Sequence, residues 1–147
     1  MLRIQKSAGR MAGAAIAVLL LLPSCTSGPP EQDGPLFHVR IKDFKIHPAL
    51  PSVEDGVVTL SVWNAGPSTH EFVVVQSDAS ADELPMGADG IRVDEDAVVP
   101  VDELEEVGAK TRGILSLSLS PGRYVLFCNL EGHYLAGMHA SLEVIAA

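Results

Sequence analysis

Hydrophobic and polar residues alternate along several short segments of the chain. Residues 57–64 and 111–120 do so most regularly, and in the second segment leucines alternate with serines. A period of two is typical of β-strands with one buried face. Residues 36–46 alternate less strictly and are expected to form a first strand, whereas residues 71–76 are a continuous apolar run that fits a strand buried on both faces.

Turn-forming residues separate these segments. The sequence N-A-G-P-S-T occupies residues 64–69, and a Pro-Gly pair at 121–122 precedes further strand-like segments at 123–128 and 138–145. Proline, glycine and asparagine favour tight turns for different backbone reasons. Short strands separated by such turns, with one long connection, predict an all-β fold: a Greek-key β-sandwich or barrel.

The long connection, residues 78–110, has a different composition. Eleven of the nineteen acidic residues lie between positions 78 and 106, where Arg92 is the only basic residue. Alanine, leucine and glutamate favour short helical turns near 79–84 and 102–107, although prolines and glycines interrupt them. We therefore expect an acidic crossover with short helical turns between two sheets, and its unusual length suggests a role at the surface.

The N-terminal part is expected to serve targeting. Residues 1–24 contain three basic residues followed by a twelve-residue apolar stretch, which is the layout of a secretory signal and is too short to span a bilayer. It ends in L-P-S-C, which resembles a bacterial lipobox and makes Cys25 the expected lipidation site. The polar, Pro/Gly-rich residues 25–35 then form a flexible tether, and residues 36–147 form one domain.

The charge of the chain restricts its partners. The formal net charge is −9, and after removal of the signal nineteen acidic residues face seven basic ones, a net charge near −12. Such a chain is not expected to bind nucleic acid, and it would be attracted to a basic partner. Solubility alone is the other explanation of this charge. We expect a monomer attached to the membrane through its lipid.

Four side chains are candidates for a metal site. If Cys25 carries lipid, Cys128 has no disulfide partner, and an unpaired thiol outside the cytoplasm is exposed to oxidation unless it is buried or metal-bound. Cys128 ends a strand, His133 lies in the following loop, Met138 begins the next strand, and His70 starts the strand after the 64–69 turn. Two histidines, a cysteine and a weak axial methionine are the ligand set of blue-copper sites, whereas structural zinc sites rarely use methionine.

Each of these residues also has an ordinary structural explanation. Cys128 and Met138 could fill the core, His133 could be a solvated loop residue, and His70 could cap a strand. Cys128 could also form a disulfide with Cys25. The combination of four candidate ligands of suitable types in this order is what favours copper.

The motifs around these residues resemble the cupredoxin family, of the plastocyanin, azurin, auracyanin or sulfocyanin type. They are H-E-F at 70–72, F-C-N-L-E-G-H-Y-L-A-G-M at 127–138 and V-W-N-A-G-P-S-T-H at 62–70. The resemblance extends over about residues 36–147. It implies one copper ion, cycling between Cu(I) and Cu(II), with a ligand set of His70, Cys128, His133 and Met138. It also implies that the edge of His133 is the port for electrons.

One position departs from the family pattern. Plastocyanins and azurins commonly have an asparagine after the first histidine, and this chain has Glu71. We expect Glu71 to accept hydrogen bonds from backbone N–H groups near the cysteine, as a charged acceptor, and to lower the reduction potential. Asn129, the residue after the cysteine, is expected beside it around the site.

The resulting functional prediction is a blue-copper protein that carries single electrons between redox partners. It is expected at the extracytoplasmic face of a bacterial membrane, or as a periplasmic or secreted protein in which Cys25 is an incidental thiol. The expected partner is a basic redox protein, such as a cytochrome or an oxidase subunit. The alternative is an extracytoplasmic protein that binds or delivers copper without electron transfer. An enzyme is not expected, because the histidines that flank the cysteine in multicopper oxidases are absent, and His38, His47 and His139 are not expected to be ligands.

Overall fold

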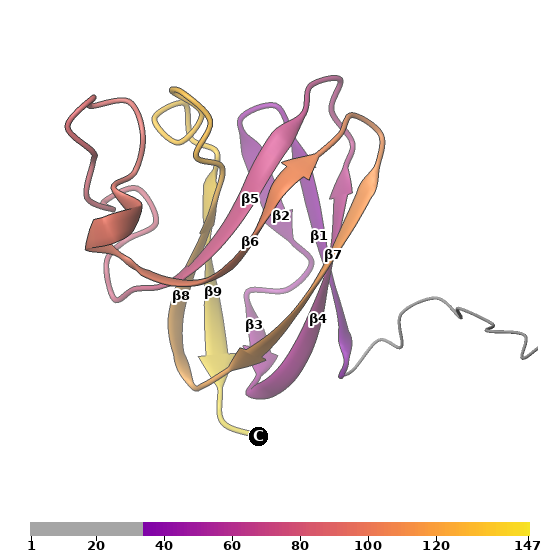
Figure 1. The fold of residues 1–147 in the computed structure, drawn as a ribbon. Coiled ribbons are helices and arrows are strands. Elements are labelled where there is room, and N and C mark those ends of the chain that lie inside the picture. The colour runs from indigo at the N-terminus through magenta and orange to yellow at the C-terminus, as the bar shows by residue number, and fades with distance from the viewer. Residues whose placement is uncertain (1–33) are drawn as a thin grey trace, which may run out of the picture.

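The alternating segments form the strands of two sheets that pack face to face (Figure 1). The structure, a computed structural model, describes residues 34–147, so the predicted signal, Cys25 and most of the tether lie outside the described residues. The four-stranded sheet has the order β2 (Lys45–Pro48), β1 (Leu36–Lys42), β4 (Gly56–Asn64) and β7 (Arg112–Leu119). The five-stranded sheet has the order β3 (Ser52–Glu54), β9 (His139–Ile145), β8 (Gly122–Phe127), β5 (His70–Gln76) and β6 (Val99–Val107).

The chain passes between the sheets several times. It leaves the first sheet after β4, enters the second at β5, and returns from β6 to β7. Most neighbouring strands are antiparallel, but β1 pairs with β4 and β3 with β9 in parallel. The predicted all-β sandwich is confirmed, and the described strands form two open sheets, without closing into a barrel.

Two apolar clusters stabilise the sandwich. The larger one lies between the sheets and includes Val62, Phe72 and Leu126, each fully buried. The smaller one lies on the other face of β5 and β8, where Val73 and Phe127 pack with residues of the 78–98 crossover. Strand β5 is therefore buried on both faces, as its continuous apolar run predicts. Residues 78–98, the acidic crossover, cover this second face and are part of the fold. Contrary to the expectation, they join β5 to its neighbour β6 in the same sheet, and the chain reaches the other sheet only after β6.

Three predictions of secondary structure were wrong in detail. Residues 36–46 do not form one strand, because a turn at 43–44 divides them into the antiparallel strands β1 and β2. Residues 102–107 are not helical but belong to β6, which pairs with β5 alone. An edge strand can leave its charged side chains in water, so tertiary pairing overrides the helix propensity of glutamate and leucine. Residues 79–84 are not helical either and contain only a turn at 81–82. The only helix that the structure describes in the crossover is η1 (Glu95–Ala97).

Three connections meet at one end of the sandwich: the β1–β2 turn, the β4–β5 turn and the β8–β9 loop (Figure 1). The side chains singled out in the sequence gather there. No helix among the described residues is long and apolar enough to cross a membrane.

Candidate metal centre

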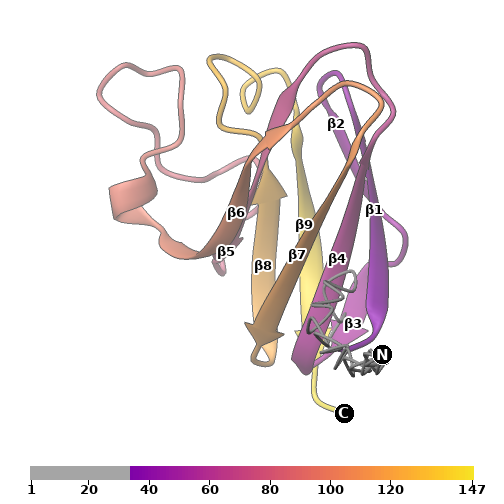
Figure 2. The ribbon, with the colours of Figure 1, turned by 45° about the vertical axis from the view of Figure 1, so that its right-hand side comes forward.

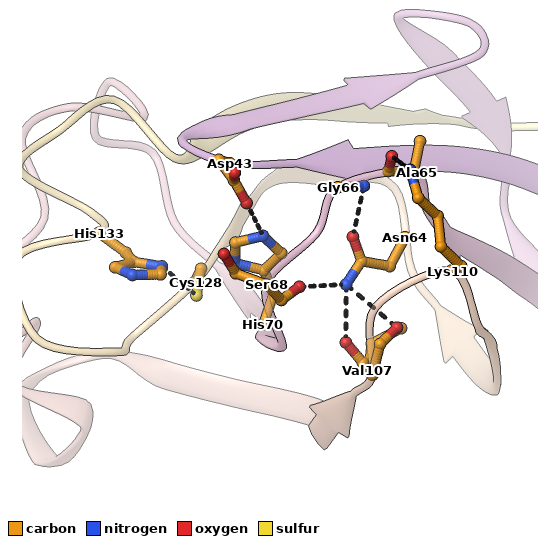
Figure 3. A network of polar contacts seen from close by, with 11 residues as sticks. Asp43, Asn64, Ala65, Gly66, Ser68, His70, Val107, Lys110, Cys128 and His133 are labelled. Atoms are coloured by element: carbon orange, nitrogen blue, oxygen red, sulfur yellow. Dashed lines mark hydrogen bonds and ion pairs between the residues drawn. The ribbon is translucent and has the colours of Figure 1, made fainter.

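The β4–β5 turn places His70 at the end of the sandwich. The buried Asn64 side chain holds this turn, because its Nδ2 donates to the carbonyl oxygens of Ser68 at 2.7 Å and Val107 at 2.9 Å (Figure 3). Its Oδ1 accepts the N–H of Gly66 at 2.9 Å. A side chain that satisfies backbone groups in this way fixes a turn that has few bonds of its own. His70 therefore enters β5 from a rigid turn.

The β8–β9 loop supplies the other three residues. The Cys128 N–H donates to the carbonyl of Met138 at 3.1 Å, and the Met138 N–H donates to the carbonyl of His133 at 3.0 Å. Gly132 and Gly137 have φ values of 74° and 95°, a left-handed conformation that favours glycine and closes the loop tightly. Two backbone hydrogen bonds thus connect all three residues within the loop, and the Met138 side chain is fully buried at its end.

Three potential ligand atoms converge between these connections. The ligand atoms of His70, Cys128 and His133 all lie within 4.8 Å of one another. Cys128 Sγ is 3.4 Å from His133 Nδ1, and the two imidazole centroids are 5.3 Å apart. Figure 3 shows both rings beside the sulfur. His70 and Cys128 are completely buried, whereas His133 is partly exposed at the molecular surface.

The two nitrogens of His70 have different environments. Nε2 lies 3.1 Å from Asp43 Oδ1 and donates to this carboxylate when the proton is on Nε2. Nδ1 is the one buried side-chain nitrogen or oxygen among the described residues that has no hydrogen-bond partner. Burial lowers the pKa of His70, while the hydrogen bond to Asp43 opposes this shift. A neutral imidazole with a bare, buried Nδ1 is unfavourable by itself, and a metal ion would satisfy it.

The surroundings of Cys128 also fit a metal. Burial raises the pKa of its thiol, the backbone N–H groups of Leu130 and Glu71 lower it, and the Glu71 carboxylate raises it further. Cys128 is the free cysteine of the described residues. Two N–H donors directed at a buried sulfur stabilise a thiolate, but a full negative charge there needs a nearby cation. A soft metal ion supplies that cation, and the donor set therefore fits copper.

Glu71 lies where the sequence predicted an acceptor. The backbone N–H of Asn129 donates to its carboxylate, beside the cysteine. Burial, followed by repulsion from Glu95 and Glu103, raises the pKa of Glu71 to about 7. The carboxylate oxygens of these three glutamates lie within 4.8 Å of one another. Without a metal, the carboxyl group is therefore partly protonated near neutral pH.

The Asn129 side chain connects the cysteine loop to the acidic crossover. Its Oδ1 accepts the Val93 N–H at 2.8 Å, and its Nδ2 donates to the Val93 carbonyl at 3.1 Å and to Glu95 Oε1 at 2.6 Å. Tyr134 adds a second connection, because its hydroxyl accepts the Leu84 N–H at 2.9 Å and donates to the Ala81 carbonyl at 2.8 Å. The crossover is thereby held against the loop that carries Cys128 and His133.

Sequence reasoning missed two residues of the β1–β2 turn. Asp43 contacts His70, and the Phe44 ring lies edge-on to His133 with centroids 5.2 Å apart. Phe44 has a φ of 58°, which is uncommon for a residue with a side chain, and 43% of its surface stays exposed. The only sequence signal was an aspartate inside an otherwise alternating segment. His38, His47 and His139 are not members of the His70–Cys128–His133 cluster.

Comparisons with known proteins identify the fold. No family model matches the chain, and no curated protein matches it. Among solved structures, it resembles dithionite-reduced auracyanin from Roseiflexus castenholzii, with a TM-score of 0.57, 18% identity, and coverage of 75% of this chain and 96% of that one. Auracyanin B gives a TM-score of 0.53 at 24% identity, with coverage of 75% of this chain and 88% of auracyanin B. Auracyanin A, a "blue" copper protein from Chloroflexus aurantiacus, gives a TM-score of 0.53 at 17% identity. That match covers 76% of this chain and 100% of auracyanin A.

The chain therefore has the cupredoxin fold, the fold of the auracyanins. At the end of its sandwich, four residues are positioned as in a type 1 copper site: His70, Cys128, His133 and Met138.

Proposed function

We propose that this protein is a type 1 copper protein that carries single electrons outside the cytoplasm. The observation that carries this proposal is the unpartnered, buried Nδ1 of His70 beside Cys128 and the Nδ1 of His133. When bound, copper would supply a one-electron couple between Cu(I) and Cu(II). The chain would supply the thiolate of Cys128, two imidazole nitrogens and the thioether of Met138.

The protein residues keep this site dry and rigid. His70, Cys128 and Met138 are fully buried, and each is fixed by a strand or by backbone hydrogen bonds. A site with a fixed shape changes little when the charge on the metal changes, so little reorganisation accompanies the electron. His133 is the partly exposed member of the set, and its edge is the proposed port for electrons.

A copper-binding or delivery protein is the second candidate function. Delivery requires a ligand set that an acceptor can reach and replace, which three fully buried ligands do not favour. An enzymatic role is not proposed, because the site offers no further histidine cluster among the described residues.

The decisive experiment is the spectrum of the copper-loaded protein. Cu(II) bound to Cys128 should give intense visible charge-transfer absorption and the narrow hyperfine EPR pattern of a type 1 site, with a reversible one-electron couple. Cys128→Ser should lose the colour. A colourless protein, or a Cys128→Ser variant that stays coloured, would remove the proposal. A colourless Cu(I) site that readily yields its metal to chelators would instead support delivery.

The proposed electron partner is a basic protein, such as a cytochrome or an oxidase subunit. The acidic crossover lies directly against the His133 loop: Gly132 N–H donates to the Ile91 carbonyl at 3.0 Å, and Arg92 pairs with Glu131 at 2.9 Å. In Figure 1 the crossover stands beside this loop at the same end of the sandwich. Exposed apolar Leu135 and Phe44 would provide the close contact next to the port.

Anchoring through Cys25 is also proposed, at the extracytoplasmic face of a bacterial membrane. Mass spectrometry of the mature protein tests it directly, since lipidation of Cys25 adds acyl mass to a chain that begins at that residue. Cys25→Ser should lose this mass and release the protein from the membrane fraction.

A further inference from the structure

The outer face of the four-stranded sheet carries a row of cationic and aromatic side chains. The strand register aligns His47 of β2 with Arg40 of β1, Arg40 with Trp63 of β4, and Trp63 with Arg112 of β7. The row runs across all four strands of this sheet, whose strands β1, β4 and β7 are visible side by side in Figure 2. Neighbouring strands are about 4.8 Å apart, so the two arginines flank one indole ring closely enough to act on one ligand.

The charge of this face is opposite to that of the protein. The chain has nineteen acidic and ten basic residues, yet no carboxylate is among the residues that line the groove here. The described ion pairs involve His70 and Arg92, and none involves Arg40 or Arg112. Two guanidinium groups on one small area, without a carboxylate partner, create a local site for an anion within an acidic molecule.

Arg112 is already oriented for such a ligand. Its guanidinium lies over the Trp63 ring, 5.5 Å from the centroid, and Nη1 donates to the hydroxyl of Ser61. Ser61 itself is buried, with 2% of its surface exposed, and so provides a fixed anchor. A guanidinium with five donors that uses one of them on Ser61 keeps others for a ligand. Because the side chain is fixed in the free protein, binding costs less conformational entropy.

The groove has the size for a small anionic group. Its volume is about 210 Å³, and its lining includes the side chains of Trp63, Arg40, Arg112, His38 and His47. A single water occupies about 30 Å³ in the liquid, so the groove holds a group of several heavy atoms. A phosphate group carries about −1.5 to −2 charges and three acceptor oxygens, which matches two guanidinium forks better than a two-oxygen carboxylate does.

We propose that the groove formed by Arg40, Trp63 and Arg112 binds a phosphate group. The site lies on the outer face of the four-stranded sheet, shares no residue with the metal centre, and does not depend on the proposed electron transfer. The phosphate has two sources with the same chemistry: free inorganic phosphate or the headgroup of an anionic phospholipid.

Trp63 allows the site to be tested directly, because it is the single tryptophan of the chain. We would titrate the full-length, copper-free protein with inorganic phosphate at constant ionic strength, with chloride as the balancing salt, and follow tryptophan fluorescence and binding heat. Saturable binding is expected. Arg40→Gln and Arg112→Gln should each weaken it about tenfold or more, because each removes a charge-assisted hydrogen bond.

The matched control is Arg123→Gln. Arg123 lies in the other sheet, on β8, and its Nη1 donates to the Asp78 carbonyl at 2.8 Å. This variant should bind phosphate like the parent protein, and circular dichroism would verify that all three variants are folded. Equal weakening by Arg123→Gln would mean that only net charge matters and would overturn the proposal.

Vesicles distinguish the two sources. The Cys25→Ser chain, which cannot be lipidated, would be mixed with phosphatidylglycerol or phosphatidylcholine vesicles and separated by flotation. Binding to phosphatidylglycerol that is lost in Arg40→Gln assigns the groove to a lipid headgroup. Binding of inorganic phosphate without vesicle binding assigns it to the free ion. Absence of saturable binding in both experiments would overturn the proposal.

Discussion

At the scale of single residues, the site depends on which ring nitrogen of His70 is left for a metal. Asp43 accepts a hydrogen bond from Nε2, so the proton stays there and the lone pair of Nδ1 faces Cys128. A carboxylate that orients a ligating histidine also makes the imidazole a stronger donor. Gly66 allows this contact, because a Cβ there would lie 3.0 Å from Asp43 Oδ1.

Replacement of Asp43 by asparagine tests this role. Asp43→Asn removes the negative charge behind His70. An asparagine at this position can donate as well as accept, so it no longer fixes the tautomer of His70. We expect copper affinity to fall by about 10- to 100-fold, and the reduction potential to rise because Cu(II) loses more stabilisation than Cu(I). Competitive chelator titration and voltammetry measure the two effects. Asp55→Asn is the control, since Asp55 accepts the Ala147 N–H far from the site, and equal effects in both variants would contradict the assignment.

The Glu71 carboxylate acts on the sulfur of Cys128 itself, whereas Asp43 acts through His70. Glu71→Gln keeps an oxygen that can accept the Asn129 N–H but removes the carboxylate charge near Cys128. A negative charge there favours Cu(II), so the variant is expected to have a higher reduction potential. The difference should be largest above pH 7, because the pKa of Glu71 is raised to about 7 and its carboxyl group is mostly ionised only above that pH. Voltammetry of the parent, of Glu71→Gln and of the distant control Glu54→Gln measures this difference. An unchanged potential in Glu71→Gln would show that the carboxylate has no influence on the metal.

At the scale of elements, strand β5 connects the core to the site. It begins with His70, is buried on both faces, and pairs with β6 and β8. Register shifts between His70 and Phe72 interrupt its pairing with β6 at the site end, where Glu71 occupies the irregular position. Such bulges direct a side chain differently from the regular pleat. The core residues of β5 therefore support the geometry of the metal centre.

Truncation of Phe72 tests that support. Phe72 is fully buried in the central cluster, so Phe72→Ala should lower the free energy of unfolding by about 3–5 kcal/mol through lost burial and a residual cavity. Urea denaturation measures the loss. Val99→Ala, at an exposed position of the edge strand β6, should change stability by less than about 0.5 kcal/mol. If Phe72→Ala changed the free energy of unfolding as little as Val99→Ala does, Phe72 would not be a core residue that supports the metal centre.

At the scale of the whole molecule, charge is distributed unevenly around the site. The crossover and β6 carry eleven acidic residues between positions 78 and 106 and are held to the copper-site loop by Asn129 and Tyr134. The outer face of the four-stranded sheet carries Arg40 and Arg112 instead. Opposite faces of one small domain can therefore attract partners of opposite charge.

Electron transfer to a basic cytochrome should consequently depend on salt. The Debye length falls from about 30 Å at 0.01 M to about 8 Å at 0.15 M ionic strength, so the bimolecular rate should fall several-fold over this range. Stopped-flow absorbance measures the rate. Asp82→Asn combined with Glu83→Gln, on the crossover, should reduce the rate at low salt.

The control for this measurement removes the same charge elsewhere. Glu54→Gln combined with Glu143→Gln changes β3 and β9, outside the crossover, and should have a smaller effect. A rate that is independent of ionic strength, or that responds equally to both double variants, would exclude the crossover as the docking element.

The sequence by itself determined the strands β4, β5, β7, β8 and β9, because period-two alternation and apolar runs directly report burial of strand faces. It also determined the candidate residues of the metal centre, since Cys128, His133 and Met138 lie on one short loop whose ends are fixed by two strands. Only the tertiary structure decided the strand character of residues 102–107, because pairing with β5 outweighs local helix propensity at a solvated edge. Only the tertiary structure, likewise, placed Asp43 behind His70 and aligned Arg40, Trp63 and Arg112, because these contacts depend on strand register and sheet packing between residues far apart in the chain.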